Sequence, residues 1–140
     1  METLINLLRR SHCSLVVRDT AGRITTYNKQ GVRDLDDLLY RHPARLQDAE
    51  VADKVIGKAA AGMMVKGGVR KAYAEVMSRQ ALPLFDQARV DYSYGKLVDH
   101  IIIAAGDNRC PLEQIVAHCQ TADEVVETLR QHFKEMKQKS

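Results

Sequence analysis

Residues 51–68, with the sequence VADKVIGKAAAGMMVKGG, constrain the fold more than any other part of the chain. This stretch is apolar or small on nearly every face, which is typical of a helix buried in a core. The small residues of Gly57–Gly62 leave room for another backbone, although each glycine costs about 1 kcal/mol of helix propensity. The pair Gly67-Gly68 supplies a positive-φ stop. We therefore predict one buried helix over the whole stretch, with Asp53 and Lys54 near its start.

The charged residues of this predicted helix lie in its first turns. Lys54 and Lys58 are four residues apart and would share a face, whereas Asp53 would point elsewhere. Either Asp48 or Asp53 could be the N-cap, and the sequence does not choose between them. If the helix packs closely on a sheet, Ala60→Leu should overpack the core at a cost of about 1–3 kcal/mol.

The bulk composition indicates a soluble globular protein. The chain has 140 residues, 45% of them hydrophobic and 28% charged, which fits a single domain (residues 1–140, core about 12–130). No apolar run approaches the roughly 20 residues that span a bilayer, so no membrane association is expected. The amphipathic N-terminus ends in Arg9-Arg10, the wrong order for a secretory signal, and we expect a cytoplasmic protein.

Charge and aromatic content speak against a nucleic-acid partner. The net charge is only +3, and the chain contains five Tyr, two Phe and no Trp, so no base-stacking surface is evident. The three cysteines, Cys13, Cys110 and Cys119, form no paired framework, which fits reduced thiols.

The remaining chain alternates between predicted strands and helices. A turn at residues 19–22 predicts a hairpin, and Thr121 with Glu124 forms a capping box. We expect strands at residues 13–19, 23–28, 69–77, 90–94 and 98–105, and helices at residues 2–10, 31–41, 80–88 and 110–119 and from Thr121 onward. A hairpin followed by alternating units favours a mixed sheet covered by helices on both faces.

Two segments together resemble a known family. Residues 51–78, VADKVIGKAAAGMMVKGGVRKAYAEVMS, and residues 106–113, GDNRCPLE, resemble a small uncharacterised prokaryotic family of the cytidine-deaminase-like superfamily. The resemblance covers roughly residues 12–130. It implies an α/β fold, a three-layer α/β/α sandwich around a mixed, roughly five-stranded sheet. It implies neither a substrate nor a reaction.

The chain departs from the zinc deaminases of that superfamily. Those enzymes open one helix with His-x-Glu and the next with Pro-Cys-x-x-Cys, which supply the zinc ligands and a proton shuttle. Here the first position reads Ala52-Asp53-Lys54 and the second reads Ser78-Arg79-Gln80-Ala81. We therefore predict no metal site, no cofactor and no zinc-dependent deamination. Superfamily members that work without metal use Lys and His at the corresponding helix start, and Lys54 could play such a part, but no histidine adjoins it.

The candidate site residues are expected to share one polar cleft. Ligands of open α/β sheets gather at the carboxyl ends of the strands, and this rule brings together Asp53, Lys54, Ser78, Cys110 and Glu113. A dipole-lowered thiol pKa could activate Cys110, although a cysteine at such a position is more often a small buried hydrophobe. The direction of the strand at residues 98–105 is open, and an antiparallel strand would move Cys110 to the far edge.

Two functions from different classes remain. The first is a metal-free domain that binds a nucleotide-like or nucleoside-like small molecule through Asp53, Lys54, Ser78 and Glu113. The second is a metal-independent enzyme that acts on such a ligand with Lys54 as acid/base or Cys110 as nucleophile. Because no complete catalytic constellation is visible, binding is favoured. The sequence leaves open whether the chain forms a homo-oligomer.

Overall fold

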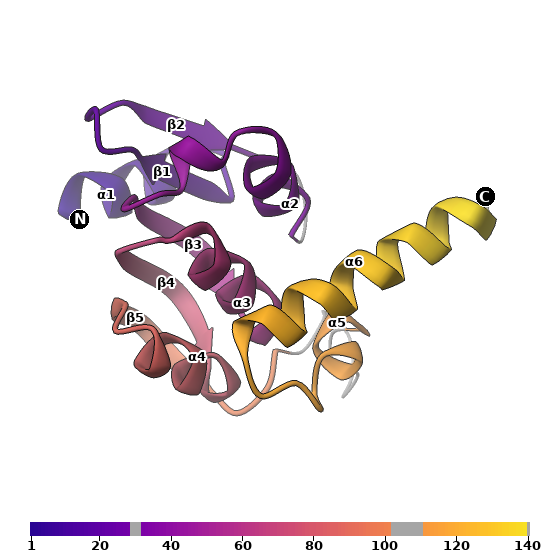
Figure 1. The fold of residues 1–140 in the computed structure, drawn as a ribbon. Coiled ribbons are helices and arrows are strands. Elements are labelled where there is room, and N and C mark those ends of the chain that lie inside the picture. Colours follow the sequence, from indigo (N-terminus) through magenta and orange to yellow (C-terminus); the bar gives the residue numbers. More distant parts are fainter. Residues whose placement is uncertain (29–31, 102–110, 140) are drawn as a thin grey trace.

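A five-stranded mixed sheet organises the fold (Figure 1). The computed structural model describes residues 1–28, 32–101 and 111–139. The strands are β1 (Leu15–Arg18), β2 (Ile24–Tyr27), β3 (Glu50–Ile56), β4 (Lys71–Ser78) and β5 (Asp91–Val98). Their order is β2-β1-β3-β4-β5. β1 is antiparallel to both of its neighbours, and β3, β4 and β5 are parallel. The predicted α/β class and mixed five-stranded sheet are therefore confirmed.

The helices are distributed unevenly between the two faces. They are α1 (Glu2–Arg10), α2 (Arg33–Arg41), α3 (Lys58–Gly67), α4 (Leu82–Gln87), α5 (Pro111–Ile115) and α6 (Ala122–Lys139), with short 3-10 turns at Pro43–Arg45 and Arg79–Ala81. Val51 belongs to the large core cluster beneath α2, α3, α4 and α6, whereas its neighbour Ala52 belongs to a small cluster beneath α1. Successive strand residues point to opposite faces, so α1 covers one face and the others cover the second.

The prediction of one helix over residues 51–68 is wrong in its first third. Residues 50–56 form the central strand β3, which pairs with β1 on one side and β4 on the other. Asp53 and Lys54 therefore lie on a strand, and Lys54 shares no helix face with Lys58. Gly57, with extended dihedral angles, is the N-cap of α3. Neither Asp48 nor Asp53 caps this helix.

The small residues of α3 allow close packing of the helix α6 as well as of the sheet. A Cβ atom at Gly62 would lie 2.7 Å from Cβ of Val125 in α6, so the two helices touch at this point. Gly68 ends α3 with a φ of 85°, as predicted. At the start of α6, Thr121 Oγ1 accepts a hydrogen bond from the Glu124 N–H at 3.2 Å, which confirms one half of the predicted capping box. The Glu124 carboxylate accepts from the Gln120 N–H at 3.4 Å and not from the Thr121 N–H.

A polar cluster reinforces the packing of α1 on the sheet. Arg9 donates to Glu75 Oε1 at 3.0 Å and to the Tyr73 hydroxyl at 3.3 Å, and Tyr73 donates to Glu75 Oε2 at 2.9 Å. Leu4 and Leu8 are buried beneath it. These contacts tie the C-terminal end of α1 to β4, while the helix itself packs on β1 and β3.

The edge strand differs from the prediction. The sequence predicts a strand at residues 90–94 that ends before Gly95, but β5 runs through Gly95 to Val98. A side chain at Gly95 would lie 2.9 Å from the Glu75 carbonyl oxygen, so glycine permits the close approach of β4. Asp99–Ile101 continue without strand structure, and residues 102–105 of the predicted strand lie outside the described residues. Among the described helices, none is long and apolar enough to cross a membrane.

Candidate functional site

A pocket lies at the carboxyl end of β3, between α2, α3 and α5. Its volume is about 290 Å³. Most of its wall is apolar, from Val32, Val55, Ala59, Ala60, Ile101 and Leu112. The ionisable groups on the wall are Asp53, Lys54 and Glu113. We call this cavity the Asp53 pocket.

Asp53 is the most perturbed carboxyl group of the pocket. Its removal from water raises its pKa from the ordinary 3.8 to about 7, and the negative charge of the buried Asp34 acts in the same direction. The N–H of Val55 donates to Asp53 Oδ1 at 3.3 Å and lowers the pKa by a smaller amount. Asp53 therefore exchanges a proton near neutral pH, and it can either accept or donate a hydrogen bond to a ligand.

Glu113 reaches from α5 to the start of a different helix. Its carboxylate accepts hydrogen bonds from the backbone N–H groups of Lys58 and Ala59, where the dipole of α3 favours negative charge. A Cβ atom at Gly57 would lie 2.6 Å from Cδ of Glu113, so only glycine leaves space for this carboxylate. Burial raises the pKa of Glu113, against the lowering effect of these hydrogen bonds and of the Lys58 charge.

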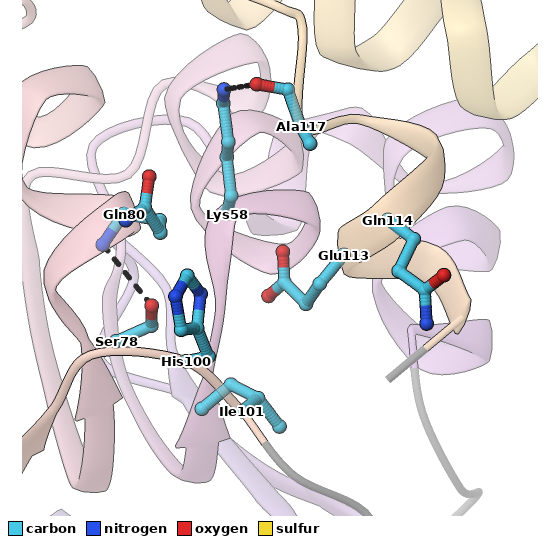
Figure 2. A pocket seen from close by; sticks show the side chains of 8 residues that line it. All are labelled: Lys58, Ser78, Gln80, His100, Ile101, Glu113, Gln114 and Ala117. Atoms are coloured by element: carbon cyan, nitrogen blue, oxygen red, sulfur yellow. Dashed lines mark hydrogen bonds between the residues drawn. The ribbon is translucent and has the colours of Figure 1, made fainter. Parts of the chain in front are cut away.

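A second, smaller pocket adjoins the first (Figure 2). Its volume is about 60 Å³, and Lys58, Ser78, His100, Glu113 and Ala117 contribute to its wall. Lys58 is buried, and its Nζ donates to the Ala117 carbonyl oxygen at 3.0 Å. In Figure 2, His100 and the Glu113 carboxylate lie below the Lys58 side chain, which runs away from them towards Ala117. We call this cavity the Lys58 pocket.

The candidate residues from the sequence divide between these two pockets. Asp53, Lys54 and Glu113 line the Asp53 pocket, and Glu113 also lines the Lys58 pocket together with Ser78. The Ser78 hydroxyl caps the turn after β4: it accepts from the Gln80 N–H at 3.1 Å and donates to the Asp99 carbonyl oxygen at 3.3 Å. Cys110 lies outside the described residues, so its place in a shared cleft stays a prediction.

Sequence reasoning missed three residues of this region. Gly57, Lys58 and His100 all line one of the pockets, yet none was a predicted site residue. For Gly57 and Lys58 a signal was present, because a β-branched Val-Ile pair followed by Gly is typical of a strand that ends before a helix. No comparable signal marks His100.

The described residues of this region form no metal site. The residues that open α3, Gly57-Lys58-Ala59, contain no zinc ligand, and neither does the turn after β4. Within residues 1–28, 32–101 and 111–139, no group of three or more His, Cys, Asp or Glu side chains is arranged to hold a metal ion. His118 contacts Cys119, whose Sγ lies 3.5 Å from the Thr128 hydroxyl oxygen.

The sequence matches a described family along almost its full length. Residues 3–133 match the family described as TM1506: Domain of unknown function (DUF1893). The chain belongs to the DUF1893 family. A comparison with curated proteins gives no match. The family assignment therefore brings no reaction or ligand with it.

A solved structure shares the fold of this DUF1893 chain. It is the crystal structure of a DUF1893 family protein, TM1506, from Thermotoga maritima, with a TM-score of 0.83. The two sequences are 23% identical, and the match covers 94% of this chain and 88% of the other. At this identity the likeness establishes the fold alone.

Proposed function

We propose that this DUF1893 domain binds a small molecule in the Asp53 pocket, and that the ligand is an amino-substituted nitrogen heterocycle of the nucleoside type. The observation that carries the proposal is a carboxyl group with a pKa of about 7 on the wall of a mainly apolar cavity. Such a combination of a concave apolar wall and a few polar groups is typical of ligand sites.

The chemistry of Asp53 favours the heterocycle. A protonated carboxyl group donates one hydrogen bond and accepts another, which matches an amino group next to a ring nitrogen, as in cytosine or adenine. An ionised carboxylate accepts from two neighbouring N–H groups, as in guanine. The apolar side chains around it would cover the faces of a planar ring. The volume of about 290 Å³ is near the lower end for ligand pockets, which suits a ligand of this size.

The resemblance to the cytidine-deaminase-like superfamily supports the same proposal. A deaminase-like, three-layer scaffold would carry its ligand beside a helix that begins at the carboxyl end of a central strand, and here that helix is α3, which follows β3. Lys54 lies exposed at the Asp53 pocket, where it could contact a charged part of the ligand. A second copy of the chain as partner, a cytoplasmic location and a catalytic role for Lys54 or Cys110 stay predictions.

The test is a binding titration with cytidine, adenosine, guanosine and uridine, followed by calorimetry or ligand-observed NMR. We expect saturable binding of at least one of the three amino-bearing nucleosides and weaker binding of uridine, which has no amino group. Saturation by none of them would contradict the proposal.

Ala60→Leu provides a variant that blocks the pocket. Ala60 lines the Asp53 pocket, so a leucine there extends into the cavity, and we no longer expect the overpacking cost predicted from the sequence. We expect at least about a tenfold loss of affinity with an unchanged unfolding midpoint. Lys96→Leu, on the exposed edge strand, is the matched control and should bind as the natural chain does. Equal affinity of Ala60→Leu and the control would place the ligand elsewhere.

A further inference from the structure

The Asp53 pocket and the Lys58 pocket share part of their walls. Glu113 and Ile101 are the residues that line both the Asp53 pocket and the Lys58 pocket. Of the two, only Glu113 is polar, and it is held at the start of α3 by the N–H groups of Lys58 and Ala59. A rotation of the Glu113 side chain would open the part of the shared wall that Ile101 does not form.

The place that Glu113 occupies suits an anion. Two backbone N–H groups at the start of a ten-residue helix point at its carboxylate, and Gly57 leaves the space for it. The carboxylate comes from another element, α5, and its burial is unfavourable for the charged form. An anionic group of a ligand, which is not attached to α5, could occupy the same place at the start of α3.

A second observation concerns the cation beside this place. Lys58 is 8% exposed, and its ammonium group donates to the neutral carbonyl of Ala117. In the described part of the chain, none of the ion pairs includes Lys58. The Lys58 charge acts on the Glu113 carboxylate, whose pKa it lowers, and a phosphate group in the place of that carboxylate would interact with the same buried cation.

We propose that the two pockets are halves of one binding site divided by the Glu113 side chain, and that the Lys58 half takes a phosphate group of the ligand in place of the Glu113 carboxylate. The Glu113 carboxylate then competes with the phosphate group for the start of α3. A nucleoside would leave the carboxylate in place, and a nucleoside monophosphate would displace it. The phosphate part rests on the proposed function. The division of the site by Glu113 does not.

The division is tested without any ligand, by labelling amines with a water-soluble acylating reagent and measuring the modified lysines by mass spectrometry. In Glu113→Ala, we expect Lys58 to react at least about five times faster than in the natural chain, because the partition is gone. The exposed Lys66 and Lys96, which line neither pocket, serve as internal controls and should react at unchanged rates. Equal Lys58 rates in both proteins would overturn the division of the site.

The phosphate group is tested by titrating the same proteins with cytidine, adenosine and guanosine and with their 5′-monophosphates. We expect Glu113→Ala to bind the monophosphate of the preferred nucleoside at least about tenfold tighter than the natural chain does, with little change for the nucleoside. A faster Lys58 reaction without this gain would overturn the phosphate assignment and leave the division intact. Failure of every nucleoside to bind, with Lys58 newly reactive, would contradict the proposed function alone.

Two further variants guard against misfolding and check the cation. If Glu113→Ala shows no cooperative unfolding transition, Glu113→Gln takes its place in the titration. Glutamine keeps the shape of the side chain but removes its charge, so this variant should also raise the affinity for the monophosphate. Lys58→Met in the Glu113→Ala background keeps the buried stem and removes the ammonium group, and it should abolish the gain for the monophosphate. A gain that persists in this double variant would overturn the role of Lys58.

Discussion

Asp53→Asn is expected to raise the free energy of unfolding by roughly 1–3 kcal/mol at pH 8 and to leave it nearly unchanged at pH 4. The pKa of Asp53 is raised from 3.8 to about 7 in the folded chain, mainly by loss of hydration. Folding therefore favours the protonated form. The natural chain loses stability as the pH rises from about 4 to about 7, because only the unfolded chain ionises freely in that window.

The amide variant separates charge from shape. Asparagine has the same size and keeps an oxygen to accept from the Val55 N–H, but it never ionises. The full pKa shift of Asp53 would correspond to roughly 4 kcal/mol in the free energy of unfolding. Water in the open pocket screens the charge, so the expected effect is smaller. Urea unfolding of both proteins between pH 4 and pH 8 measures the effect.

The control is an exposed carboxylate on the edge strand. Asp91 lies 3.9 Å from the Lys71 ammonium, and its side chain is 75% exposed. Asp91→Asn should change the stability by no more than about 0.5 kcal/mol at either pH. A stabilisation by Asp53→Asn that is the same at pH 4 and pH 8 would show that ionisation of Asp53 is not its cause.

Local sequence signals were sufficient for most of the elements. The turn at residues 19–22 gave the hairpin, because Asp19 Oδ1 accepts from the N–H groups of Ala21 and Arg23. Ser78 stands between a predicted strand and a predicted helix, and it ends β4 and caps the 3-10 turn that follows. In these places the chemistry that defines the element lies within a few residues of sequence, so no distant partner has to be known.

The boundary between β3 and α3 could not be predicted by the same means. Residues 51–56 contain Ala and Lys, which favour helices, next to Val and Ile, which favour strands. Pairing decides between them, since Asp53 lies opposite Leu15 of β1 and Ala74 of β4. Those partners are far away in the sequence, and the apolar character of a doubly covered strand resembles that of a buried helix.

The candidate site was only partly accessible from sequence for a related reason. The rule that ligands gather at the carboxyl ends of strands placed Asp53, Ser78 and Glu113 in one neighbourhood, although Asp53 was assigned to the wrong element. Glu113 lies in the first turn of α5, where an acidic side chain can complement the dipole of its own helix. Its carboxylate instead lies at the start of α3, a contact that depends on how α5 is packed and on the missing side chain of Gly57.

Gly62→Ala is expected to lower the free energy of unfolding by roughly 1–2 kcal/mol, although alanine is the better helix former. Propensity alone predicts a gain of about 1 kcal/mol. The added methyl group, however, would lie 2.7 Å from Cβ of Val125 and still closer to its Cγ1, and overpacking of this kind costs about 1–3 kcal/mol. The sign of the change therefore reports whether α3 and α6 are in contact.

Val125→Ala supplies the matched background for this variant. Val125 is fully buried, so its truncation alone should destabilise the protein by leaving a cavity. In that background the methyl group at position 62 fills the space, and Gly62→Ala should become neutral or stabilising. Urea unfolding of the four proteins gives the coupling energy, which we expect to exceed about 1 kcal/mol in favour of the double variant. If the changes in unfolding free energy of the two substitutions are additive, Val125 of α6 does not contact α3 at Gly62. The small residues of α3 would then be required by the sheet, the partner first expected from the sequence.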